Sequence, residues 1–115
     1  MITPCKSKPN CVSSLNQDER FHIEPLRYDN LETAKNKLLK VLKSFKGVRI
    51  ITTNEYYIHA EFTSLIFRFV DDVEFYFDAN ANLVHLKSAS RIGYSDFRTN
   101  RKRIEAIRRK FLQGG

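Results

Sequence analysis

The sequence has no tryptophan, one methionine and two cysteines, and none of its apolar runs approaches the roughly 20 residues that a membrane-spanning helix needs. A transmembrane segment is therefore not expected. The residues after Met1 lack the basic and apolar regions of a signal peptide, so the chain is either cytoplasmic or the product of a trimmed leader. No repeat, low-complexity segment or linker divides it. We therefore expect one domain, 1–115.

The composition is otherwise that of an ordinary globular domain, with 42% hydrophobic and 29% charged residues. Nine Phe and five Tyr predict a core rich in aromatic packing. The formal net charge is +7, and its distribution is uneven. Residues 1–90 hold 12 Lys/Arg against 11 Asp/Glu, whereas residues 91–115 hold 8 against 2. The basic excess therefore belongs to the last segment.

Two helices are predicted by apolar positions at helical spacing. The first, 30–46, begins after Asp29, which can form a capping box with Glu32, and Gly47 follows its end. The second, 96–112, can be capped by Asp96 or Ser95. The expected buried stripes are Leu31, Ala34, Leu38, Val41, Leu42 and Phe45 in the first helix, and Phe97, Ile104, Ile107 and Phe111 in the second.

Between the helices the apolar period changes to two, which is typical of half-buried strands. Strands are expected at 48–53, 56–62 and 65–70, and after a break at Asp71–Asp72 also at 73–78 and 83–90. Short connections favour an antiparallel meander. We therefore predict an α+β two-layer sandwich, in which a four- to five-stranded meander is covered by the two helices. An extended arm, 1–28, precedes the 29–115 core.

Several motifs resemble the domain-of-unknown-function family numbered 1499, which occurs in bacteria and in plastid-bearing eukaryotes. They are Pro4–Cys5 with Pro9–Asn10–Cys11–Val12–Ser13–Ser14, then Ala60–Glu61–Phe62 and Phe69–Val70–Asp71–Asp72–Val73–Glu74–Phe75, and finally Ser88–Ala89–Ser90–Arg91–Ile92–Gly93–Tyr94–Ser95–Asp96 with Asn100–Arg101. Arg98 departs from the family, which usually has glycine near that position. The resemblance implies work outside the cytoplasm, because members often carry a leader or membrane anchor. It implies no catalytic residue, cofactor or reaction.

The cysteines, Cys5 and Cys11, lie six positions apart in the arm. Two neighbouring cysteines in a segment with little core favour a disulfide in an oxidising compartment. A zinc site is less favoured, because this spacing lacks the close pairing of zinc ligands. A catalytic thiol would need one of His22, His59 or His85 as its base. No metal or cofactor is predicted.

The strands also carry a row of polar side chains. Two histidines and two carboxylates in this row can bind a metal or move protons. An antiparallel sheet, however, commonly has one solvated face on which opposite charges pair. We favour the solvated face. The row comprises His59, Glu61, Glu74, Tyr76, His85 and Lys87.

The closing motif is the candidate ligand-binding site, because it spans a strand end, a glycine-containing turn and a helix start. Its arginines and hydroxyls can bind a phosphate or carboxylate beside a helix N-terminus. The competing interpretation is structural: Asp96 caps the helix, and Arg91 or Arg101 pairs with Asp71, Asp72 or Asp96. The candidate residues are Ser88, Ser90, Arg91, Tyr94, Ser95, Asp96, Asn100 and Arg101.

Three functions are considered for the chain. The favoured one is a non-enzymatic binding or accessory domain of the cell envelope or plastid lumen, in which the Arg91–Arg101 region recognises an anionic small molecule, a lipid head group or an acidic protein surface. A small hydrolase- or transferase-like enzyme would use the Ser/Tyr/Asp cluster, but no base adjoins Ser95. A nucleic-acid-binding module would use the last helix, but no recognised nucleic-acid motif accompanies it.

Overall fold

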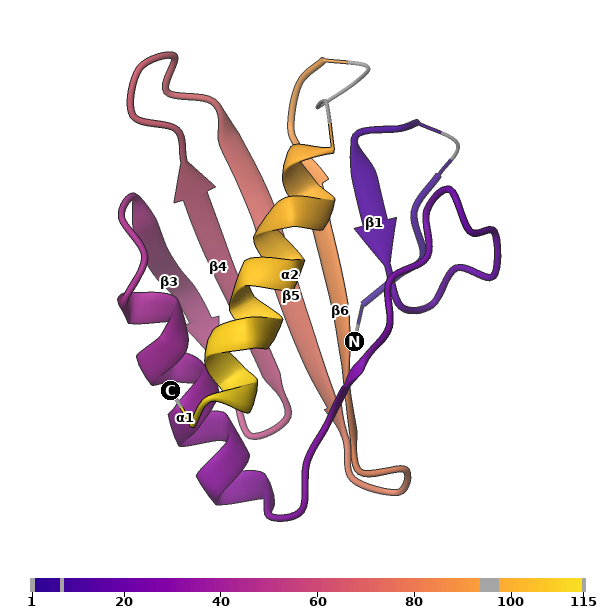
Figure 1. Cartoon of the computed structure of the whole chain (residues 1–115), viewed down its shortest axis with the longest axis vertical. Coiled ribbons are helices and arrows are strands. Elements are labelled where there is room, and N and C mark those ends of the chain that lie inside the picture. The colour runs from indigo at the N-terminus through magenta and orange to yellow at the C-terminus, as the bar shows by residue number, and fades with distance from the viewer. Residues whose placement is uncertain (1, 7, 94–97, 115) are drawn as a thin grey trace.

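The computed structural model describes residues 2–6, 8–93 and 98–114, and its sheet lies behind two helices (Figure 1). The elements run in the order β1 (Cys11–Ser13), β2 (Leu26–Arg27), α1 (Leu31–Lys43), β3 (Val48–Thr53), β4 (Tyr57–Thr63), β5 (Val70–Asp78), β6 (Leu83–Ser90) and α2 (Thr99–Leu112).

The sheet is antiparallel, with the strand order β1-β6-β5-β4-β3, and β2 also pairs with β6. β3 to β6 form the expected meander. The strand count is six because the arm contributes the short strands β1 and β2. Neither carries a repeating apolar pattern. Both are strands because they pair with the backbone along the edge of β6. At the opposite edge, β3 contains a register shift between Ile50 and Thr52.

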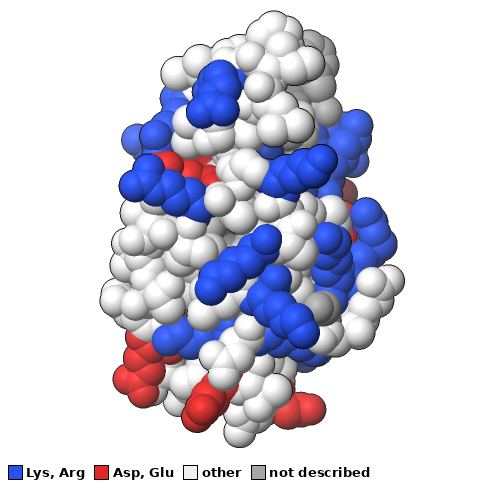
Figure 2. All heavy atoms as spheres, turned by 90° about the vertical axis from the view of Figure 1, so that its left-hand side faces the viewer, with Lys and Arg blue, Asp and Glu red and all other residues white. Residues whose placement is uncertain are grey.

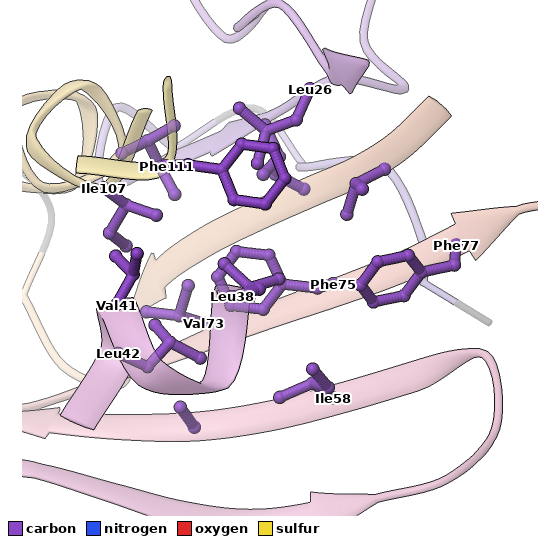
Figure 3. Close-up of a cluster of buried hydrophobic side chains, with 14 of the residues drawn as sticks. Leu26, Leu38, Val41, Leu42, Ile58, Val73, Phe75, Phe77, Ile107 and Phe111 are labelled. Carbon is purple, nitrogen blue, oxygen red and sulfur yellow. The ribbon is translucent and has the colours of Figure 1, made fainter. Parts of the chain in front are cut away.

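Strict alternation gives the meander one buried and one open face, because successive side chains point to opposite sides of a strand. On the buried face, Ile58, Val73 and Phe75 are fully enclosed. Both helices cover this face, and Figure 3 shows side chains of α1 and α2 over those of the strands. The α+β two-layer sandwich is thus confirmed. The helical part of this core comprises Ala34, Leu38, Val41, Leu42, Ile104, Ile107 and Phe111.

The bounds of α1 differ from the prediction at both ends. Asn30, not Asp29, is the N-cap: its side-chain oxygen accepts from the Thr33 amide at 2.9 Å. Both residue types suit a cap, and Asn30 is the one whose side chain meets the third helical amide. The helix ends at Lys43, where the Ser44 hydroxyl donates to the Val41 carbonyl at 2.6 Å. Gly47 lies beyond a turn and has a left-handed φ of 74°.

The strand expected at 65–70 is absent, and Leu65–Phe67 form a turn in the loop between β4 and β5. Asp71 and Asp72, expected as a break, instead lie inside β5. Charged residues remain in this strand because each carboxylate has a cationic partner: Arg103 meets Asp71 and Arg91 meets Asp72, both at 2.8 Å.

The start of α2 also corrects the prediction. The N-cap is Arg98, in a left-handed conformation with φ of 67°, and the helix begins at Thr99. The expected caps, Ser95 and Asp96, lie outside the described residues, as does Phe97. Glycine adopts a left-handed backbone conformation at little cost. This accounts for the family's preference for glycine near this position without invoking space for a ligand.

Gly47 is expected to tolerate no side chain. A Cβ there would overlap the carbonyl oxygen of Thr63, whose amide donates to the Gly47 carbonyl at 2.9 Å. Gly47→Ala should therefore lower the free energy of unfolding by about 2 kcal/mol, measured by urea denaturation. Gly114→Ala is the control, because Gly114 has the same sign of φ and no atom within 4 Å of a built Cβ. Equal losses in the two variants would contradict the steric explanation.

Candidate functional site

Three residues of the closing motif meet inside the protein. Ser88 and Asn100 have no exposed surface. The Ser88 hydroxyl donates to the Asn100 side-chain oxygen at 2.6 Å, and the Asn100 amide donates to the Ser90 hydroxyl and to the Asn10 carbonyl, both at 3.0 Å. Asn10 in turn donates to the Gly93 carbonyl at 2.7 Å. This buried polar cluster joins the arm, β6 and α2.

The cluster extends to a charge pair that the sequence prediction missed. Arg103 donates to the Asn100 side-chain oxygen at 3.0 Å and pairs with Asp71 at 2.8 Å. Its guanidinium also lies over the Phe62 ring, 4.9 Å from the centroid. The signal was present in the periodicity. Asp71 falls on the inward positions of β5, and Asn100 and Arg103 fall near the Ile104 stripe of α2.

The two predicted arginines lie elsewhere. Arg91 extends over the open face of the sheet, where it pairs with Asp72 and Glu61. Arg101 reaches the arm, donating to the backbone carbonyls of Glu19 and Arg20 at 3.4 and 3.3 Å. The described residues of the motif therefore do not converge on a single cavity. Its remaining members, Tyr94, Ser95 and Asp96, lie outside the described residues.

The open face is a grid of cross-strand polar contacts centred on Asp72. Its carboxylate accepts from Arg91 and lies 2.8 Å from the His59 ring nitrogen. The hydrogen bond from Arg91, with a smaller contribution from His59, holds the pKa of Asp72 below its usual value. Beside it, the Tyr57 hydroxyl donates to Glu74 at 2.6 Å. Burial, reinforced by this contact, raises the pKa of Tyr57.

The two histidines of the open face are not neighbours. His59 is opposite Glu74 across β4 and β5, and His85 is opposite Tyr76 across β5 and β6. The His85 ring instead lies 3.0 Å from the Ser14 hydroxyl in the arm. Within the described ranges, no three His, Cys, Asp or Glu residues are grouped so as to hold a metal ion.

The arm is fastened by the expected disulfide. Cys5 and Cys11 are bonded, with their Cα atoms 5.8 Å apart. The Asn16 side chain closes the same segment, accepting from the Cys5 amide at 2.7 Å and donating to the Cys5 carbonyl at 3.2 Å. Because Cys11 is paired with Ala89 in the sheet, the bond holds the preceding residues against the edge of β6.

A cavity of about 280 Å³, here called the arm pocket, lies between this segment and β6. Three lysines line it, and no described lining residue is acidic. Lys87 donates to the Thr3 hydroxyl at 2.9 Å, which connects the two walls. Sequence reasoning did not predict this site, because no motif links 3–11 with 87–89. The lining comprises Thr3, Pro4, Lys6, Lys8, Asn10, Cys11, Lys87 and Ala89.

A larger hollow, of about 420 Å³, lies at the start of α1. Its charged lining residues are mixed: Glu32 and Glu55 face a single cation, Lys35. The hollow therefore lacks the uniform charge of the arm pocket.

Several basic side chains of α2 form contacts with other parts of the same chain. Arg108 pairs with Glu105 at 2.9 Å and donates to the arm carbonyls of Glu24 and Pro25. Lys110 donates to the Ser44 hydroxyl at 2.9 Å and lies over the Phe45 ring. These cations join α2 to the arm and to the end of α1. No helix in the described ranges combines the length and apolar character needed to cross a bilayer.

The fold and its polar clusters define a small α+β domain whose sheet has one helix-covered and one open face. Comparison with known families agrees with the resemblance seen in the motifs. The model of the family described as "Protein of unknown function (DUF1499)" matches residues 1–111, and the chain belongs to this family. No curated protein matches the sequence.

The Arg103–Asp71 pair is expected to be structural, because its side chains are only 15% and 11% exposed. Arg103→Met would leave a buried carboxylate unpaired and should lower the free energy of unfolding by about 3 kcal/mol in urea. Lys102→Met, at the exposed neighbouring position, should have little effect. The double variant Arg103→Met/Asp71→Asn should lose less stability than the two single losses added together. Additive losses would show that the ions do not interact.

The Asp72 cluster is expected to make stability depend on acid pH. Because the pKa of Asp72 is lowered in the folded protein, its contribution is present above the unfolded value of about 3.9 and is lost as pH falls through the folded value. Asp72→Asn should therefore flatten the fall of the unfolding free energy below about pH 4, measured by urea titrations at several pH values. Asp29→Asn, at an exposed position, is the control. An unchanged acid slope in Asp72→Asn would refute this assignment.

Proposed function

We propose that this protein is a non-enzymatic binding domain that holds an anionic group in the arm pocket. The observation that carries the proposal is the lining of that pocket by Lys6, Lys8 and Lys87, with no acidic residue among its described lining. Within the described part of the chain, none of the three lysines forms an ion pair. A bound anion would relieve their mutual repulsion.

The carboxylates nearest the pocket across the sheet already have partners. Glu74 lies opposite Lys87 and accepts from the Tyr57 hydroxyl. Asp72 lies opposite Ala89, and Glu61 is next to Asp72 in the register. Arg91 pairs with both of them. The single guanidinium thus offsets part of their negative charge on the open face, so that these two carboxylates oppose an incoming anion less. In this arrangement Arg91, a predicted site residue, assists binding by pairing with the carboxylates.

The size and chemistry of the pocket favour a phosphate or carboxylate group. A cavity of about 280 Å³ is near the lower limit for small-molecule sites. Ammonium groups bind phosphate and carboxylate through charge-assisted hydrogen bonds, and the Thr3 hydroxyl adds a neutral donor. A free small molecule and the head group of a lipid can both present this chemistry.

The disulfide supports work outside the cytoplasm, in the cell envelope or plastid lumen. Cys5–Cys11 closes the segment that forms one wall of the pocket, and such bonds persist in oxidising compartments. In a reducing compartment the wall would lose this link. The binding site and the compartment are thus proposed together.

Anion binding can be measured as a rise in melting temperature with inorganic phosphate, at ionic strength held constant with sodium chloride. The oxidised wild type should be stabilised progressively as phosphate is added. Lys87→Gln should weaken the apparent affinity roughly tenfold, because a charge-assisted hydrogen bond is lost. Lys40→Gln, which removes an exposed lysine from α1, should bind as the wild type does.

Two further measurements complete this experiment. Short-chain phosphatidic acid below its micelle concentration, compared with phosphate, separates a lipid head group from a free anion as the preferred source. Cys5→Ser/Cys11→Ser tests the wall and should weaken binding. If Lys87→Gln and Lys40→Gln respond alike, or if sodium chloride stabilises as well as phosphate does, the arm pocket is not an anion site.

A further inference from the structure

The loop between β4 and β5 exposes apolar side chains that the core does not use. Leu65 is 69% exposed, Ile66 83%, Phe67 73% and Phe69 51%. The loop that follows β6 adds Ile92, at 64%. The Arg91 amide donates to the Val70 carbonyl at 3.2 Å, which places the two loops side by side. These five residues are called the apolar tip below. A cluster of this kind on a protein surface marks an interaction site.

The loop is built to hold these side chains outward. The Ser64 amide donates to the Phe69 carbonyl, and the Phe69 amide donates to the Ser64 hydroxyl, both at 2.9 Å. Between these closing bonds Arg68 has a left-handed φ of 60°. The Phe67 and Phe69 rings stack at 5.6 Å. The closed turn therefore presents its apolar groups as one projection.

Charge divides the two ends of the molecule. In the described loops at the end with the apolar tip (44–47, 64–69, 91–93 and 98), every charged residue is basic: Lys46, Arg68, Arg91 and Arg98. In the loops at the opposite end (28–30, 54–56 and 79–82), the charged residues are Asp29 and Glu55. Figure 2 shows acidic side chains gathered at the lower end and a largely uncharged upper end, with Lys, Arg and a smaller acidic group below it.

We propose that the apolar tip inserts into the interfacial layer of an anionic lipid bilayer, with Lys46 and Arg68 on the head groups. The β4–β5 loop and the loop that follows β6 lie at one end of the longest axis (Figure 1), so both face a flat surface in the same orientation. Apolar side chains reach the boundary of head groups and acyl chains while Lys and Arg contact anionic phosphates. The acidic end faces away from the membrane. A projecting tip fits the soft interfacial layer, whereas a protein partner would need a matching cavity.

This inference is independent of the arm pocket, which is lined by other residues. It assigns the β4–β5 loop a role in positioning the domain at a membrane surface. The arm pocket would then be held near that surface whatever anion it binds.

Partitioning onto vesicles tests the proposal, with phosphatidylglycerol-rich vesicles compared with pure phosphatidylcholine. The wild type should sediment with the anionic vesicles and be released by high salt. Ile66→Ser/Phe67→Ser should weaken partitioning by at least about tenfold, and Arg68→Gln by about fivefold. Leu112→Ser removes an equally exposed apolar side chain from the end of α2 and should change nothing. The melting temperatures of all these variants should match the wild type, because the altered side chains lie outside the core.

Because the sequence has no tryptophan, the fluorescence of one introduced indole can report whether the apolar tip enters the bilayer. Phe67→Trp places a single indole in the tip, and its emission should shift to the blue with anionic vesicles. Leu112→Trp should show no shift. The proposal is overturned if the wild type ignores anionic vesicles, or if it binds them equally well without Ile66 and Phe67. It is also overturned if Lys6→Gln/Lys87→Gln abolishes partitioning while the tip variants retain it, because the arm pocket would then hold the lipid.

Discussion

The interaction on which the rest of the structure depends is the buried hydrogen bonding of Asn100. One amide side chain joins β6 through Ser88 and Ser90, the arm through the Asn10 carbonyl, and the Asp71 strand through Arg103. A buried amide without partners costs several kcal/mol, so these segments take positions that satisfy it. Hydrophobic burial brings α2 onto the sheet, and the polar cluster determines the register in which it lies. Ser88, Ser90 and Asn100 of the closing motif thus have a structural use.

Intramolecular pairing also determines how much positive charge the protein presents at its surface. Twenty basic residues give a net charge of +7, yet many cations of the last segment are occupied within the protein. Arg103 neutralises a strand carboxylate, Arg108 joins the arm and Lys110 joins the end of α1. Net charge therefore overstates the basic surface that α2 presents to partners. The cations that line the arm pocket and surround the apolar tip come from the arm, the strands and the loops instead.

Local pattern was enough to predict the elements with their own periodicity. The stripe from Ala34 to Leu42 and the alternation around Phe75 each depend on neighbours in sequence, so both the helix and the meander were predictable. The predictions were wrong where tertiary contacts determine the secondary structure. Leu65 and Phe67 are typical of a strand but lie in a turn, while Asp71 and Asp72 lie inside a strand because distant arginines pair with them. The arm pocket joins residues more than 75 positions apart, and no spacing rule relates them.

The two edges of the sheet explain why its hydrogen bonding ends where it does. An open strand edge is a template on which other chains can add strands. At one side, the disulfide-closed arm occupies the edge of β6 with β1 and β2. At the other, β3 carries the register shift after Ile50 and the exposed cation Arg49, and both features hinder regular pairing. The arm thus protects the chain against strand-by-strand aggregation. Reduction of one short covalent loop would release the residues before Cys11, whereas β1 and β2 would keep their own pairing along β6.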